Sequence, residues 1–65
     1  MLWTDVIEIA IELYEKYPAQ DPRYIGFVDL HNLICQLESF EDDSSRGGEK
    51  VLEAIQAAWI EEASE

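Results

Sequence analysis

The sequence is poor in cysteine. Cys35 is the only one among 65 residues, so an internal disulfide and a zinc site built from several cysteines are both excluded. The sequence also has no apolar run of membrane-spanning length, and its first residues, Met-Leu-Trp-Thr-Asp, lack the basic start and apolar core of a secretory signal. A chain of this kind suits a reducing compartment. We therefore expect a cytoplasmic protein.

Basic residues are also few. Four Lys and Arg stand against fifteen Asp and Glu, which gives a formal net charge of −11. A surface of that sign repels nucleic acids and anionic membranes and attracts basic proteins and cations. With 48% hydrophobic residues, the chain can still bury a core. We therefore expect a folded acidic protein that binds neither nucleic acid nor membrane.

The short length limits the chemistry. We predict a single acidic helical domain over residues 1–65, which buries about 60% of the surface that its unfolded chain would expose. Such a domain has little room for a deep catalytic cleft. The sequence also shows no nucleophilic side chain accompanied by both a general base and a group that would orient that base. The sequence therefore predicts a monomer that is not an enzyme.

The first amphipathic stretch covers residues 6–17. Its apolar residues recur at helical spacing, Thr4 or Asp5 precedes it as a cap, and Pro18 ends it. We expect Ile7, Ile11 and Tyr14 to widen the buried face. The inward side chains that this spacing predicts are Val6, Ile9, Ala10, Leu13 and Tyr17.

Two more helices and one short turn are expected. The central helix begins near Asp29, which would cap it, and its apolar stripe continues to Leu37. The third helix covers 49–62 and follows a flexible Ser-Ser-Arg-Gly-Gly linker, and residues 21–25 form a helical turn.

The fold class that these elements predict is all-α. No stretch alternates apolar and polar residues, so no sheet is expected beyond a short strand near Phe27 or Phe40. A small three- to four-helix domain with two helices around a glycine-containing turn is compatible with a helix-turn-helix or winged-helix arrangement.

The first helix carries a row of carboxylates. At 100° per residue, Asp5, Glu8, Glu12 and Glu15 fall on one ridge, with only Lys16 at its edge. Solvated helix faces normally mix both signs, and like charges one turn apart destabilise a helix. We interpret this acidic ridge as a docking surface for a basic partner, with weak metal binding as the second interpretation.

A second acidic cluster, Glu41, Asp42 and Asp43, follows the central helix. Clustered carboxylates suit hard cations, ferrous iron among them. A calcium-loop frame read from Asp42 fails because Arg46 stands at a ligand position. A shallow, low-affinity cation site is the interpretation that is left.

The only histidine, His31, lies one helical turn before Cys35 and near Glu38. A His and a Cys at this spacing supply half of a transition-metal site, and the other ligands would come from elsewhere. We adopt the structural interpretation, a boundary histidine hydrogen-bonded to Glu38 beside a half-buried thiol.

Short motifs follow one another in a fixed order along nearly the whole chain. They are Trp3-Thr4-Asp5, Leu13-Tyr14, Tyr17-Pro18, Asp21-Pro22, Phe27, Asp29 with His31, Ile34-Cys35, Leu37-Glu38, Phe40, Asp42-Asp43, Glu49-Lys50, Leu52-Glu53-Ala54-Ile55, Trp59 and Glu62-Ala63. In this order they resemble the IscX family, small acidic accessory proteins of the bacterial iron–sulfur cluster assembly system.

The resemblance implies a modified winged-helix arrangement and a partner. That partner is the pyridoxal-phosphate-dependent cysteine desulfurase, at a basic surface shared with frataxin, with ferredoxin or the cluster scaffold as further candidates. The family's only implied cofactor is ferrous iron, held weakly by surface carboxylates. The matching positions and the ridge give the predicted partner-binding residues Asp5, Glu8, Glu12, Glu15, Asp29, Glu38, Glu41, Asp42 and Asp43. The predicted iron ligands are Asp5, Glu8, Asp29, Asp42 and Asp43.

The predicted function is therefore that of an accessory protein of iron–sulfur cluster assembly, which binds cysteine desulfurase through its acidic surface and modulates its activity. Two alternatives stay open. The protein could carry iron to the scaffold, or it could act as an acidic DNA mimic that occupies a nucleic-acid-binding protein.

Overall fold

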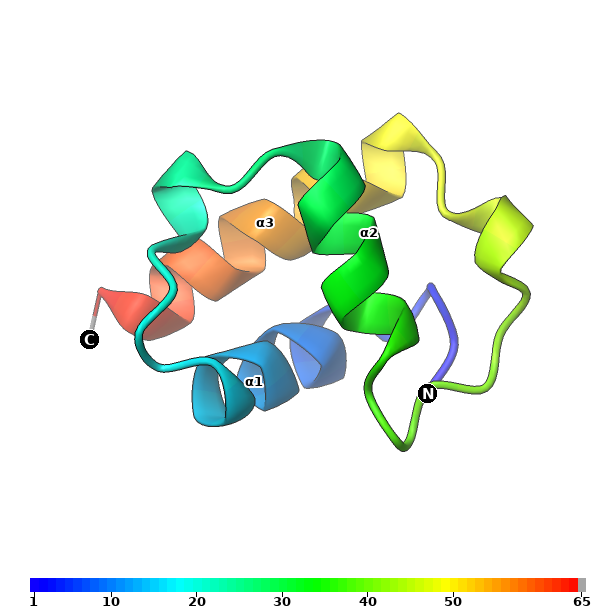
Figure 1. Ribbon diagram of the computed structural model, residues 1–65, viewed down its shortest axis with the longest axis horizontal. Coiled ribbons are helices and arrows are strands. Elements are labelled where there is room, and N and C mark those ends of the chain that lie inside the picture. Colours follow the sequence, from blue (N-terminus) through cyan, green and yellow to red (C-terminus); the bar gives the residue numbers. More distant parts are fainter. Residues whose placement is uncertain (65) are drawn as a thin grey trace.

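A computed structural model describes residues 1–64, in which the regular structure is entirely helical. The element order is α1 (Val6–Lys16), η1 (Pro22–Tyr24), α2 (Phe27–Cys35), η2 (Ser44–Arg46) and α3 (Glu49–Ala63), where η marks a single 3-10 turn. In Figure 1, α1 and α3 run in the same general direction and α2 crosses in front of them. The all-α prediction is confirmed. The winged-helix detail stays a prediction.

Helix α1 begins and ends where its sequence signals stand. Asp5 is the N-cap residue and Tyr17 is the C-cap residue, whose amide donates to the carbonyl of Leu13 at 2.9 Å. Pro18 follows and cannot continue the helical hydrogen bonds. The Asp5 carboxylate, however, does not cap the helix. It accepts a hydrogen bond from the amide of Leu2 at 2.8 Å and so fixes the chain that enters α1.

Helix α2 begins three residues earlier than predicted. Its N-cap residue is Gly26, with an extended backbone, so the prediction that Asp29 caps the helix was wrong. Phe27 and Val28 are compatible with helical backbone and form the first turn, where the charge of Asp29 meets the positive end of the helix dipole. The helix also ends earlier, at Cys35, although the buried stripe continues through the next turn to Leu37.

Helix α3 follows the linker as predicted and extends one residue beyond the expected end, to Ala63. It is the longest helix of residues 1–64, at 15 residues, and no helix in that range has the length and apolar character to cross a membrane. The predicted turn around residues 21–25 is also present, as η1 with Asp21 as its N-cap residue.

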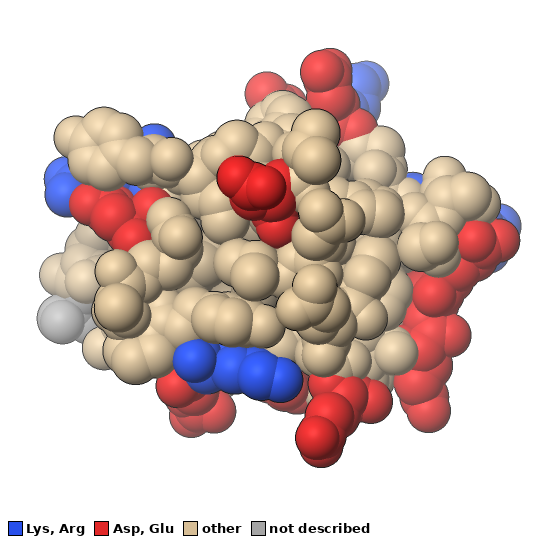
Figure 2. Space-filling model, viewed as in Figure 1, with Lys and Arg blue, Asp and Glu red and all other residues tan. Residues whose placement is uncertain are grey.

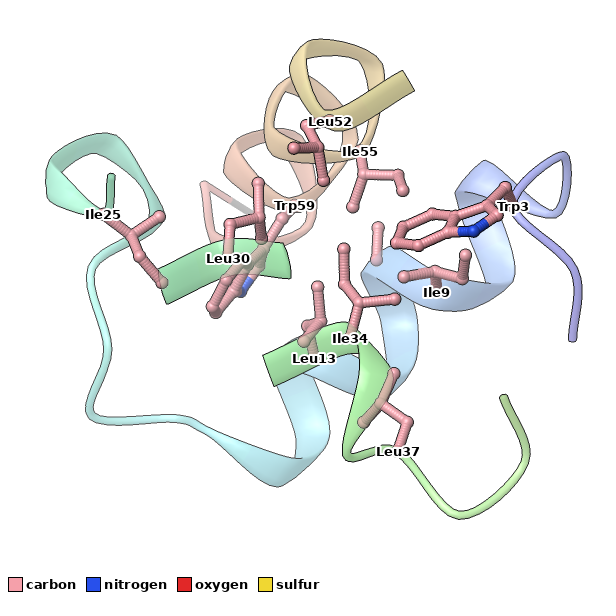
Figure 3. Packing of buried hydrophobic residues seen from close by; sticks show 11 residues of the cluster. Trp3, Ile9, Leu13, Ile25, Leu30, Ile34, Leu37, Leu52, Ile55 and Trp59 are labelled. Carbon is pink, nitrogen blue, oxygen red and sulfur yellow. The ribbon is translucent and has the colours of Figure 1, made fainter. Parts of the chain in front are cut away.

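The core lies where the three helices meet (Figure 3), and α1 and α3 share the largest helix–helix interface. The buried hydrophobic residues are Trp3, Ile9, Ala10, Leu13, Ile25, Leu30, Ile34, Leu37, Leu52, Ile55 and Trp59. Each helix contributes residues at the spacing that lines one face. Such packing holds the outer faces of the helices in fixed positions.

The predicted apolar face of α1 was too wide. Ile7, Ile11 and Tyr14 are exposed, because the partners α2 and α3 cover only the side of α1 that carries Ile9, Ala10 and Leu13.

Candidate docking surface

The acidic ridge of α1 lies on the solvent side of the helix, as its spacing predicted. Glu8 and Glu15 are exposed, and no hydrogen bond or ion pair holds either carboxylate within residues 1–64. Asp5 and Glu12 are half-buried at the side of the ridge. Anchored and free carboxylates therefore alternate along the ridge: Asp5 and Glu12 are anchored, and Glu8 and Glu15 are free.

The anchored carboxylates connect α1 to other segments. The Glu12 carboxylate accepts a hydrogen bond from the hydroxyl of Ser39 at 2.6 Å, which joins the middle of α1 to the chain that follows α2. Ser39 stands next to Glu38, and Glu41 is two residues further on. Both are exposed. The structure thus brings the ridge beside the second acidic segment, which spans residues 38–43.

Almost none of this negative charge is neutralised. Within residues 1–64 the one ion pair joins Arg23 to Asp21 at 2.9 Å, at the η1 turn, where it holds the pKa of Asp21 below its ordinary value. Figure 2 shows carboxylates around the margin of one face, with basic side chains among them, both at the lower edge along which α1 runs and at the right-hand edge where the segment between α2 and α3 lies. The centre of that face is mostly uncharged.

Asp42 and Asp43 have a structural role that the sequence did not reveal. One oxygen of the Asp42 carboxylate accepts from the amide of Trp3 at 3.0 Å and the other from the amide of Asp43 at 2.7 Å. The Asp43 carboxylate accepts from the amide of Ser45 at 2.9 Å and from its hydroxyl at 2.8 Å, which caps η2. These donors favour the charged form, so they lower the pKa of both carboxyl groups.

Trp3 organises this acidic segment, a role that its sequence motif does not reveal. Its side chain is 4% exposed, and its indole N–H donates to the carbonyl of Asp43 at 2.8 Å. The ring meets Phe40 edge-on with centroids 4.6 Å apart and stacks on His31 at 5.4 Å. A buried tryptophan needs an acceptor for its N–H, but nothing local in the sequence says which acceptor.

The first residue also contributes. The amino group of Met1 donates to the carbonyl of Ser39, and the carbonyl of Met1 accepts from the amide of Glu41 at 2.9 Å. The first three residues and residues 39–43 therefore hold each other in place.

The predicted hydrogen bond between His31 and Glu38 was wrong. The Nε2 atom of His31 lies 2.7 Å from the carbonyl of Ser44, and because a carbonyl only accepts, Nε2 donates. The Nδ1 atom lies 3.8 Å from the Cys35 sulfur, which donates to it. Burial raises the pKa of the Cys35 thiol, which keeps it protonated. The hydrogen bond from His31 to Ser44 therefore connects α2 to the segment before α3, and Cys35 helps to orient the His31 ring.

Asp29 stands apart from the other predicted site residues. It is exposed in the first turn of α2, and the six helical positions from Asp29 to the end of α2 at Cys35 correspond to about 9 Å of rise, so it lies at the opposite end of α2 from Glu38. Across residues 1–64, no three His, Cys, Asp or Glu side chains gather closely enough to hold a metal ion. The five predicted iron ligands thus share no single site, and their role stays a prediction.

Fold and surface together define a class: a small, acidic, all-α domain that offers an unneutralised helix face. A family model described as iron–sulphur cluster assembly matches residues 1–64. An uncharacterized protein of Pseudomonas aeruginosa is 65% identical over 60 residues, which cover 92% of this chain and 91% of that protein. The chain therefore belongs to the iron–sulphur cluster assembly family of IscX, as its motifs indicated.

Proposed function

We propose that the protein is a non-enzymatic accessory factor of iron–sulfur cluster assembly, which docks on the system's cysteine desulfurase through the acidic ridge of α1 and modulates its activity there. The observation that carries the proposal is the free state of Glu8 and Glu15, which face solvent and form no ion pair within residues 1–64, although Lys16 lies at the edge of the ridge. Unpaired carboxylates on a rigid helix attract a basic surface and speed its association.

The segment of residues 38–43 supports the ridge in this proposal. Glu38 and Glu41 extend the negative surface beside Ser39, while Asp42 and Asp43 hold the segment in place. Asp29, at the other end of α2, would contribute to the field around the molecule and not to the contact.

We include ferrous iron in the proposal as a loosely held ion. Its support is the density of free carboxylates along α1, because hard or borderline cations take oxygen ligands. Without three carboxylates at one point among residues 1–64, iron would bind weakly and would compete with the desulfurase for the ridge.

The test is a charge reversal on the ridge. Glu8→Lys should weaken binding to purified cysteine desulfurase by about tenfold or more in calorimetry at low salt, and the loss should shrink as salt screens the charges. Glu53→Lys is the matched control, because it changes the net charge equally from an exposed site on α3, outside the ridge. Equal affinity of both variants would reject the ridge as the interface, and circular dichroism should show unchanged helix content in each.

A further inference from the structure

The solvent side of α1 is only half acidic. Ile7, Ile11 and Tyr14 are 60%, 37% and 41% exposed, and they follow one another at positions i, i+4 and i+7, which places them in one continuous row along the helix. Single exposed hydrophobic residues are normal in soluble proteins, whereas a contiguous row marks an interaction site.

This apolar row comes nearest to the free carboxylates at Ile11. At 100° per residue, Ile11 lies about 40° from Glu15 and about 60° from Glu8 around the helix axis, whereas Ile7 and Tyr14 lie about 80–120° from both. Burial of Ile9, Ala10 and Leu13 fixes the opposite side of α1 against the core, so the two rows keep this arrangement. A partner that reaches Glu8 and Glu15 therefore also meets the apolar row.

The charge of the face decides what covers it. A second copy of this chain would bring its own net charge of −11 and a second row of carboxylates against the first, which is repulsive. A segment with apolar side chains flanked by Lys or Arg would bury the isoleucines and neutralise Glu8 and Glu15 together. An amphipathic basic helix has this pattern, with anchors one turn apart.

We infer that the outer face of α1 is a two-part docking surface for a basic amphipathic segment of the partner. The carboxylates steer the partner and set the association rate, while Ile7, Ile11 and Tyr14 hold it and set the dissociation rate. This inference rests on the proposed function and adds an apolar component to it.

The experiment measures association and dissociation rates with purified cysteine desulfurase at several salt concentrations. The variant is Ile7→Gln with Ile11→Gln, which leaves the charge unchanged and, since Gln favours helix more than Ile, does not weaken α1. The matched control is Val28→Gln on α2, at a β-branched residue that is 76% exposed outside this face.

The double variant should dissociate about tenfold faster, with its association rate and salt dependence within twofold of the unchanged protein. The Val28→Gln control should bind like the unchanged protein. If the double variant matches this control while Glu8→Lys still slows association, the inference is overturned and the proposed function stands. If the unchanged protein does not bind the desulfurase at all, both are overturned.

Sedimentation of the protein alone tests whether a second copy of this chain covers the outer face of α1 instead. A monomer at all concentrations is expected. A dimer that disappears in the Ile7→Gln, Ile11→Gln variant would show that a second copy covers the face, and would overturn the inference.

Discussion

Two acidic regions of this molecule have the same formal charge and different roles. The ridge of α1 and the segment of residues 38–43 each carry four carboxylates. In each region two carboxylates accept hydrogen bonds within residues 1–64 and two do not. On the ridge, Asp5 and Glu12 accept one bond each and Glu8 and Glu15 accept none, whereas in the segment Asp42 and Asp43 together accept four and Glu38 and Glu41 accept none. A run of acidic residues is therefore not by itself a binding site, because hydrogen bonds decide which carboxylates are free.

The largest expected effect comes from removing the side chain that holds the second region. Trp3→Ala should lower the free energy of unfolding by about 3–5 kcal/mol, which is comparable with the whole stability of a domain this small, about 5 kcal/mol or less. Urea unfolding followed by circular dichroism measures the loss. Trp3→Phe keeps much of the packing against Phe40 and loses only the indole donor, so its loss should be intermediate. A Trp3→Ala variant as stable as the unchanged protein would contradict this role.

The next effect tests how closely the linker packs on the same tryptophan. A Cβ atom at Gly47 would lie 2.5 and 2.6 Å from atoms of the Trp3 ring and 2.9 Å from the His31 ring. Since Trp3 is buried and cannot move aside, Gly47→Ala should cost about 1–3 kcal/mol. Gly48→Ala is the control, because a Cβ there meets nothing within 4 Å, and its loss should be below about 1 kcal/mol. Equal losses of stability in the two variants would show that the Trp3 side chain moves aside to make room for the added Cβ atom.

A direct comparison of the two regions uses neutral isosteres. Asp42→Asn should lower the melting temperature, because the amide group is a poorer acceptor than a carboxylate and its NH2 group cannot accept from an amide N–H. Glu8→Gln should change the melting temperature little, since relief of the repulsion from Glu12 one turn away is offset by loss of a favourable negative charge in the first turn of α1. A larger fall for Glu8→Gln than for Asp42→Asn would reverse the assignment of roles.

The smallest effect is the pH dependence of the second region. The pKa values of Asp42 and Asp43 are lowered from 3.8, so their contribution to stability is complete above that pH and is lost as the pH falls through the lowered values. The indole N–H signal of Trp3 in an NMR titration reports this loss, and its change should begin only below about pH 4. In Asp42→Asn the low-pH change should shrink. A midpoint between pH 5 and 7 would contradict the assignment.

The sequence predicted the parts of the structure that depend on neighbours along the chain. The spacing of Ile9, Ala10 and Leu13 gave α1 and its ridge, and Pro18 gave its end. The start of α2 was missed because Asp29 was taken as the N-cap residue, whereas Gly26 serves in that position.

The remaining errors concern contacts between distant segments. Trp3 and Asp42 are 39 positions apart, and His31 reaches Ser44 across 13 positions. No local pattern specifies such pairs, because they depend on how the helices pack. For the same reason the exposure of Ile7 and Ile11 could not be predicted. The spacing of hydrophobic residues shows which side of a helix is apolar, but it does not show how much of that side neighbouring helices cover.

The most direct test of the central claim is to locate the desulfurase on this protein by NMR. The labelled chain is titrated with purified cysteine desulfurase at low salt, and the loss of each amide signal is followed. Signals of residues 6–16 in α1 should weaken first, while those of residues 42–45 persist, because the carboxylates of Asp42 and Asp43 stay bonded within the chain. Losses centred on residues 42–45, with α1 unaffected, would contradict docking through α1.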